Sequence, residues 1–357
     1  MKRITAFLIC ILIICTTLSG CDLPFFREGH KINSQLLTGE IGLRAHFVDV
    51  GQGDCILLES QGQFALVDAG EYSQKDTVVS YLCSMGVDNI DYVISTHPHS
   101  DHCGSLSEVI RSFDCDVLLT PDTHSESSVF DYVLDAADER GVEVRYAEKG
   151  DTYTLGSSSI TVLSPDKDSV YSSLNDYSLV CKVEYGNTSL LLTGDAEKVV
   201  EDELLREDAD LNADVLKCGH HGSSTGNTLP FIMAVNPAAA IITCGKDNDY
   251  GHPHKETTET LDILGIPVWR TDRDSTIIMM SDGESISIGS QSKNESLIET
   301  LPSLPNEPPY IGNRNTKVFH STDCTSIKSI KSKNRIEFFT REKAVEYSYS
   351  PCKACNP

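Results

Sequence analysis

The chain has 357 residues and a formal net charge of −24, with 39% hydrophobic and 23% charged residues. This composition supports one large buried core with a smaller satellite and excludes disorder throughout the chain. The excess of acidic residues excludes a basic protein that wraps nucleic acid over its whole surface, so any contact with nucleic acid must be local.

The first twenty residues have the layout of an export signal. Two basic residues precede an apolar run over residues 4–18, which is shorter than the roughly 20 residues that span a bilayer. The run ends in Leu-Ser-Gly-Cys21, which resembles the lipobox of bacterial lipoproteins. We therefore expect a signal peptide over 1–20, and an extracytoplasmic protein attached to the bacterial cell membrane only through lipid on Cys21, with a tether over 21–43. An ordinary signal peptide with a chance cysteine is the alternative.

Residues 44–288 alternate strand-like and helix-like runs, which is the pattern of an α/β domain. So many short strands in one domain indicate two sheets. The predicted strands are 45–50, 55–58, 64–67, 92–95, 160–163, 179–185, 189–193, 214–218, 239–243, 276–280 and 285–288, and the predicted helices are 76–85, 105–113 and 128–140.

The composition changes after residue 288. Residues 289–309 are polar and contain four prolines, as linkers do. We expect residues 310–357 to form a separate small module. Basic residues outnumber acidic ones in this module, opposite to the rest of the chain, which indicates either an anionic partner or simply a soluble basic surface.

Three histidines and an aspartate crowd one loop directly after a predicted strand. The loop contains His97, His99, Asp101 and His102 in the pattern H-x-H-x-D-H. Imidazole nitrogens and carboxylate oxygens suit Zn²⁺, Mn²⁺ or Fe²⁺. In an extended turn, alternate residues direct the first two histidines to one ion and the next two residues to another. The loop therefore predicts a metal centre.

Five further motifs follow a recognisable order around this loop. They are Phe47–Asp54 (F-V-D-V-G-Q-G-D), Leu66–Gly70 (L-V-D-A-G), Leu192–Asp195 (L-T-G-D), His220–Ser223 (H-H-G-S) and Tyr250–Pro253 (Y-G-H-P). With the histidine loop, they resemble the hydrolase domain of ComEC-type DNA-uptake proteins in the metallo-β-lactamase superfamily. The resemblance implies an α/β fold, an αββα sandwich with metals at one edge of the sheets, over residues 44–288.

The resemblance also implies a dinuclear centre with a set of ligands for each metal. The first metal is assigned His97 and His99, the second Asp101, His102 and one of His220 or His221, and Asp195 bridges the two. The superfamily usually adds another histidine before the bridging aspartate. Asn175 stands in the corresponding place here and resembles the asparagine of ComEC-type domains. We therefore expect a first site that is less selective for zinc and open to Mn²⁺, since oxygen-rich ligation favours manganese.

Other polar residues are candidates for supporting or substrate-binding roles. Asp49, Asp54 and Asp68 lie at predicted strand ends, where they either orient the histidines or stabilise turns. Lys217 precedes the histidine pair and either meets a phosphate or closes a strand. His252 either meets substrate in the cleft or is an ordinary loop histidine.

The last module contains a second pattern of metal ligands. His320-x₃-Cys324 is followed by Cys352-x₂-Cys355, a spacing typical of structural Zn²⁺ in a domain with little core. A disulfide with a spare thiol is the alternative. The module resembles the metal-binding domain of the Ada DNA-repair protein, which implies DNA contact. His320 stands where that family has its methyl-accepting cysteine, so methyl transfer is not expected.

Together these features predict an extracytoplasmic metal-dependent hydrolase. We expect a phosphodiesterase or nuclease that acts on DNA through water activated by two divalent ions, Zn²⁺ or Mn²⁺, with Asp101 and Asp195 as catalytic residues and one structural Zn²⁺ in the tail module. The alternatives are a hydrolase of another exported phosphoester or cell-wall substrate, and a non-catalytic DNA-binding lipoprotein.

Overall fold

A computed structural model describes residues 40–123, 127–290, 296–298, 308–331 and 334–357. The expected signal peptide, the lipidation site Cys21 and nearly all of the expected tether lie outside the described residues. Within these ranges, no helix has the length and apolar character needed to cross a membrane.

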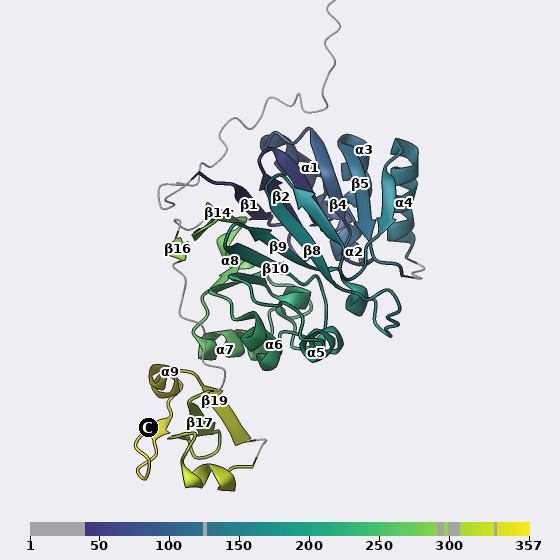
Figure 1. Ribbon diagram of the computed structural model, residues 1–357. Helices are drawn as coiled ribbons and strands as arrows, with labels where there is room; N and C mark the ends of the chain where they lie inside the picture. The colour runs from purple at the N-terminus through teal and green to yellow at the C-terminus, as the bar shows by residue number, and fades with distance from the viewer. Residues whose placement is uncertain (1–39, 124–126, 291–295, 299–307, 332–333) are drawn as a thin grey trace, which may run out of the picture.

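The larger domain contains two sheets (Figure 1). The first has nine strands in the order β16-β15-β14-β1-β2-β3-β4-β5-β6. Its strands are β1 (Leu43–Phe47), β2 (Cys55–Ser60), β3 (Gln63–Ala69), β4 (Asn89–Ile94), β5 (Asp114–Thr120), β6 (Glu143–Tyr146), β14 (Ile277–Ser281), β15 (Ile286–Ser290) and β16 (Ser296–Ile298). Strand β16 pairs antiparallel with β15, so part of the stretch expected to be a linker extends this sheet.

The second sheet has seven strands in the order β13-β12-β11-β10-β9-β8-β7. Its strands are β7 (Thr152–Leu155), β8 (Ser158–Ser164), β9 (Val180–Tyr185), β10 (Thr188–Leu192), β11 (Val215–Lys217), β12 (Ala239–Ile242) and β13 (Val268–Arg270). Strands β10 to β13 run parallel to one another, as β3 to β6 do in the first sheet. The carboxyl ends of parallel neighbours meet at one edge, which is where loops can bring polar side chains together.

Helices cover the outer face of each sheet, and the two sheets bury a common core between them (Figure 1). Helices α1 (Lys75–Ser84), α3 (Leu106–Ser112) and α4 (Ser128–Arg140) pack on the first sheet. Helices α5 (Lys198–Arg206), α6 (Leu229–Val235) and α7 (Lys255–Leu264) pack on the second. The sequence-based prediction of an αββα sandwich is therefore confirmed.

Glycine ends two of the longer helices in a way that the sequence dictates. Helix α4 ends at Gly141 (φ 69°) and α7 at Gly265 (φ 75°). Both glycines adopt the left-handed conformation, which costs glycine no steric penalty and lets its N–H reach a carbonyl of the last turn. The chain can then reverse directly into β6 or towards β13.

The tail module forms a separate four-stranded sheet in the order β19-β17-β18-β20. Its elements are β17 (Tyr310–Asn313), β18 (Val318–Ser321), β19 (Arg335–Phe338), α9 (Arg341–Glu346) and β20 (Ser350–Pro351). The module contacts α7 through Asp262, whose carboxylate accepts hydrogen bonds from Lys343 Nζ and Tyr347 Oη, each at 2.6 Å. These contacts join the tail to the helical layer of the second sheet (Figure 1).

Candidate metal centre

Loops that follow three strands supply the predicted ligands. The histidine loop follows β4 and includes the short helix α2 (Ser100–Cys103). Asp195 comes three residues after the end of β10, and the pair His220-His221 follows β11. These strands end at the same edge of the sandwich, and the loops that follow them lie together there. Residues more than a hundred positions apart in the sequence, such as Asp101 and His221, are therefore neighbours.

Four of the predicted ligands form a tight cluster. The ligand atoms of Asp101, His102, Asp195 and His221 all lie within 4.8 Å of one another. His102 Nε2 is 3.1 Å from Asp195 Oδ1, and His221 Nε2 is 3.2 Å from Asp101 Oδ2. Two imidazoles and two carboxylates at these separations are a donor set that suits Zn²⁺ or Mn²⁺.

The hydrogen bonds that the Nδ1 atoms of His102 and His221 make determine which nitrogen of each ring faces the cluster. His102 Nδ1 donates to Asp68 Oδ2 at 2.8 Å, and His221 Nδ1 donates to the carbonyl oxygen of Thr243 at 3.0 Å. Each Nε2 therefore faces carboxylate oxygens and is the nitrogen that would offer its lone pair to a bound metal ion. His102 Nε2 and Asp195 Oδ1 are buried, and neither has a hydrogen-bond partner among the described residues. Without a bound ion, a proton on His102 offsets the charge of Asp195, and a metal ion that displaced this proton would be bound by both atoms, so these residues fit a metal ion.

The electrostatics of the cluster favour positive charge. Burial lowers the pKa of His102, but the charges of Asp195 and Asp68 outweigh burial and raise that pKa well above its ordinary value. Despite burial, the charge of Asp195 and a hydrogen bond with Asp101 raise the pKa of His221 to about 9. Burial raises the pKa of the Asp195 carboxyl, yet the charges of His102 and His221 hold it well below its usual range. The carboxylates thus remain ionised and available as ligands.

Asp68 and Asp54, two of the carboxylates considered for supporting roles, lie directly behind the cluster. Asp68 is fully buried and also accepts hydrogen bonds from the backbone N–H and the hydroxyl of Thr96, at 2.8 and 2.6 Å. Asp54 Oδ1 lies 3.4 Å from His221 Nδ1 and accepts a hydrogen bond from the Thr243 hydroxyl. Both carboxylates hold histidine rings in place.

Lys217 and Asp49 have other positions. Lys217 is fully buried, and its Nζ forms an ion pair with Asp54 Oδ2 at 2.8 Å. It therefore neutralises a buried carboxylate and cannot contact a substrate. Asp49 Oδ1 accepts a hydrogen bond from the backbone N–H of Gly51 at 3.2 Å. This bond stabilises a turn of the F-V-D-V-G-Q-G-D motif, so Asp49 behaves as a turn residue.

The first predicted site is looser than the cluster. His97 Nε2 is 3.1 Å from His99 Nδ1 but 3.9 Å from Asp195 Oδ2. Asn175 is buried, and its Oδ1 has no hydrogen-bond partner in the part of the chain that the structure describes. Its Nδ2 donates to Glu197 Oε1 at 3.3 Å. The oxygen of Asn175 is thus the unpaired atom, as a ligand to a hard cation must be.

The adjacent residues His220 and His221 lie in different surroundings. Both have left-handed backbone conformations, with φ of 48° for His220 and 53° for His221, which is costly for residues other than glycine and typical of functional sites. His221 is fully buried beside Asp101, whereas His220 Nε2 lies 3.7 Å from Asp195 Oδ2. His220 Nδ1 lies 3.1 Å from Glu197 Oε1, which also binds Asn175. His221 therefore belongs to the cluster, and His220 faces the looser site.

A glycine lets the G-Q-G-D segment lie against the metal loop. Gly53 has φ of 131°, and a Cβ on it would lie 2.2 Å from the backbone oxygen of Asp101. The same oxygen accepts a hydrogen bond from the N–H of Asp54 at 3.1 Å. Any side chain at position 53 would displace Asp101, so this motif positions a ligand from outside the histidine loop.

The ligands open onto a cleft of about 300 Å³. Its lining consists of Gln52, His99, Ser100, Asp101, Asn175, Asp195, His220, His221, Tyr250 and His252. His252 therefore lies in the cleft, which is one of the two positions considered for it from the sequence. Burial lowers the pKa of His252 to about 4, and the nearby charges of His221 and His220 add to the effect, so this ring is neutral at physiological pH.

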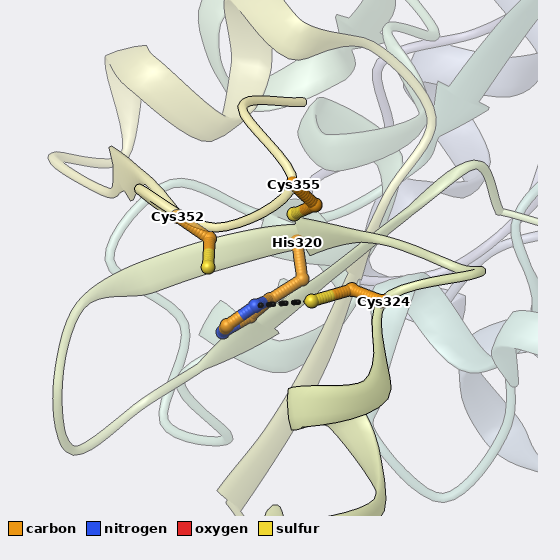
Figure 2. Close-up of side chains that lie close together, drawn as sticks. All are labelled: His320, Cys324, Cys352 and Cys355. Atoms are coloured by element: carbon orange, nitrogen blue, oxygen red, sulfur yellow. Dashed lines mark hydrogen bonds between the residues drawn. The ribbon is translucent and has the colours of Figure 1, made fainter.

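The four predicted ligands of the tail module also meet (Figure 2). The ligand atoms of His320, Cys324, Cys352 and Cys355 lie within 4.8 Å of one another. His320 Nδ1 is 3.4 Å from Cys324 Sγ. Backbone N–H groups of Cys355 and Ala354 lower the pKa of the Cys352 thiol, which favours the thiolate that binds metal. Three sulfurs and one imidazole fit structural zinc.

Three residues that support the ligands were not predicted from the sequence. The Ser178 hydroxyl accepts a hydrogen bond from the Asp195 N–H at 3.0 Å and lies 3.3 Å from His97 Nδ1. Glu197 joins Asn175 to His220, and Thr243 holds His221. Glu197 lies two residues after Asp195 and Ser178 three after Asn175, so proximity to those ligands was a usable signal. Thr243 offered none, because its contact with His221 joins loops that follow two different strands, β11 and β12, 22 residues apart in the sequence.

Comparisons with known proteins agree with this geometry. Residues 48–246 match the family model described as "Metallo-beta-lactamase superfamily". The chain is 33% identical over 248 residues to "ComE operon protein 3" of Bacillus subtilis, covering 64% of this chain and 32% of that protein. It is 26% identical over 230 residues to "Competence protein ComA" of Neisseria gonorrhoeae, covering 63% and 30%. It is 28% identical over 219 residues to "Recombination protein 2" of Haemophilus influenzae, covering 60% and 26%. The match thus spans a third or less of each relative's length.

Proposed function

Because the chain belongs to the metallo-β-lactamase superfamily and is a metal-dependent hydrolase related to competence proteins, we propose that it cuts phosphodiester bonds in DNA. The observation that carries the proposal is the pair of buried atoms His102 Nε2 and Asp195 Oδ1, which face each other at 3.1 Å within a cluster of four ligands. Relatives named for competence and for recombination support DNA as the substrate.

The residues divide into two sites. Asp101, His102 and His221 would hold one metal ion, and Asp195 would face both ions. His97 and His99 would hold the other ion, with the Asn175 oxygen and His220 completing its surroundings. When bound, two divalent cations lower the pKa of water and offset the charge of a phosphoryl group.

The chain's own residues orient this centre and shape its opening. Asp68 and Thr243 fix the ring orientations of His102 and His221, so both Nε2 atoms stay directed inward. The cleft admits a substrate beside Asp195, and the neutral ring of His252 lines it without adding charge. The Asn175 oxygen gives the first site harder ligation, which favours Mn²⁺ there over Zn²⁺.

The tail module has a separate proposed role. Its cluster of three cysteines and His320 would hold one structural Zn²⁺, and its excess of basic residues would contact DNA phosphates without reading sequence. Attachment to a membrane through lipid on Cys21, with the enzyme outside the cytoplasm, completes the proposal and rests on the N-terminal sequence.

Cleavage of labelled single- and double-stranded DNA by the purified protein tests the proposal. The reaction is run with Mn²⁺, with Zn²⁺ and with EDTA. Cutting that requires a divalent ion and stops with EDTA is the expected result. DNA bound but left intact under all three conditions would instead support a DNA-binding lipoprotein, and neither binding nor cutting would move the proposal to other exported phosphoesters or cell-wall substrates.

A further inference from the structure

The rim of the metal cleft carries an exposed aromatic ring that the metal centre does not use. Tyr250 lines the cleft, and 67% of the residue is exposed. Its ring stacks on that of His252, with centroids 5.7 Å apart and 21° between the planes. The ring is therefore available at the mouth of the cleft, and covering it with a flat ligand would remove apolar surface from water.

The loop that presents Tyr250 is held by hydrogen bonds on both sides of it. The side chain of Asn248 donates to the carbonyl of His252 at 2.6 Å and accepts from the His252 N–H at 2.9 Å. The His254 N–H donates to the Gly222 carbonyl at 3.0 Å, which anchors the loop to the histidine pair. A ring on a fixed loop loses little conformational entropy when a flat ligand packs on it.

The cleft lacks the usual means of binding a polyanion. Among the described residues that line it, none is lysine or arginine, and two are aspartates. Beyond the contribution of bound metal ions, the part of a substrate that lies in the cleft must therefore gain binding free energy from contacts other than ion pairs. Stacking of a nucleobase on an aromatic ring supplies this, at about 1–3 kcal/mol per base, and depends little on sequence.

We propose that Tyr250 is a stacking platform for a nucleobase beside the cleaved phosphate and that it selects single-stranded over double-stranded DNA. A base in a duplex is already stacked between its neighbours, so only an unpaired or frayed base can lie on the ring. This inference rests on the proposal that DNA is the substrate, and it assigns the strand preference to one side chain of the cleft.

The test compares a short oligothymidylate with an oligonucleotide of the same length whose residues are abasic. Affinities are measured by fluorescence anisotropy in EDTA, where no cutting is expected, and KM and kcat are measured with Mn²⁺. The original ring should favour the oligothymidylate by roughly 5- to 150-fold, which is the stacking free energy given above converted to a ratio. Tyr250→Ala should abolish this preference, and Tyr250→Phe should retain it because the ring remains.

A matched control is Tyr132→Ala on α4, which removes a tyrosine that is 61% exposed away from the cleft and should leave the preference unchanged. If the original protein and Tyr250→Ala prefer oligothymidylate over the abasic oligonucleotide equally, the inference is overturned even if DNA is cut. It is also overturned if Tyr250→Phe loses this preference as fully as Tyr250→Ala does. If DNA is bound with the predicted preference but is never cut, the stacking platform stands and the proposed hydrolysis fails.

Discussion

The Asp68 carboxylate lies 2.8 Å from His102 Nδ1, and both side chains are fully buried. The carboxylate accepts a hydrogen bond from Nδ1 of His102 and fixes the orientation of the ring, so that Nε2 points at Asp195. This arrangement links a residue of β3 to the metal cluster, so a change at Asp68 should affect metal binding although Asp68 is not itself a ligand.

Replacing Asp68 should therefore weaken metal binding without removing a ligand. Asp68→Asn is expected to lower metal affinity by about 10- to 100-fold, because the amide no longer attracts the Nδ1 proton with a full charge. Isothermal titration calorimetry with Mn²⁺ and Zn²⁺ measures this. Asp49→Asn, which alters a turn carboxylate, is the matched control. Equal affinities for both variants and the unaltered protein would show that Asp68 has no such role.

The ion pair between Lys217 and Asp54 should be structural. Lys217→Met is expected to lower the free energy of unfolding by about 3–5 kcal/mol, because it leaves the Asp54 carboxylate buried without a counter-charge. The double variant Lys217→Met/Asp54→Asn removes both charges and should recover part of this loss. Urea denaturation measures all three proteins. A single variant as stable as the original would mean that water or another group reaches Asp54.

His46 should make the domain sensitive to mild acid. It is buried in β1 next to the Tyr81 hydroxyl and Arg44, and burial, with a smaller contribution from Arg44, lowers its pKa from 6.5 to about 4. Between pH 6.5 and about 4, His46 is protonated in the unfolded chain but stays neutral in the folded chain. The free energy of unfolding therefore decreases as pH falls from 6.5 towards 4, and this group does not affect it above that range.

His46→Gln removes this titration and provides the comparison. The stability advantage of the original protein over the variant should shrink by about 2 kcal/mol between pH 7 and pH 5, at about 1.4 kcal/mol for each unit below 6.5. Denaturant unfolding at both values of pH gives the two differences. An advantage that is constant between pH 7 and pH 5 would contradict the assignment.

The tail cluster should hold zinc independently of the hydrolase centre. Cys352→Ser should reduce the zinc content by one ion per chain and weaken retention of long DNA, while cleavage of short oligonucleotides is preserved. Elemental analysis and DNA binding measure the two effects. Cys115→Ser, at a half-buried thiol of β5, controls for loss of a cysteine alone. Unchanged zinc content in Cys352→Ser would argue for a disulfide or unbound thiols in the tail.

The sequence predicted those parts of the site that are local in the chain. The H-x-H-x-D-H loop carries four of the predicted ligands within six residues, so its spacing alone indicated a metal centre. The choice between His220 and His221 was not predictable, because it depends on two consecutive left-handed residues. Lys217 could equally have met a phosphate, and only the tertiary packing of β11 shows that it is buried against Asp54.

For the fold too, elements with a clear local sequence pattern were predicted, and those that depend on distant contacts were not. Strands with apolar alternation were predicted close to their observed bounds, for example β8 and β10. Helix α7 was missed, since its first turns are rich in threonine, which has weak helix propensity, and it is stabilised by burial of Leu261 and Leu264. The contact between Asp262 and Lys343 joins residues 81 positions apart, and no local pattern predicts it.

The cluster of Asp101, His102, Asp195 and His221 is proposed to hold a metal ion that DNA cleavage requires. The most direct measurement is single-turnover cleavage of single-stranded DNA by Asp101→Ala beside the unaltered protein, with bound metal counted in both. Asp101→Ala should cleave at a rate more than about 100-fold lower, which exceeds the effect of losing a supporting residue, and it should hold less metal while keeping its fold by circular dichroism. Unaltered turnover by Asp101→Ala would contradict it.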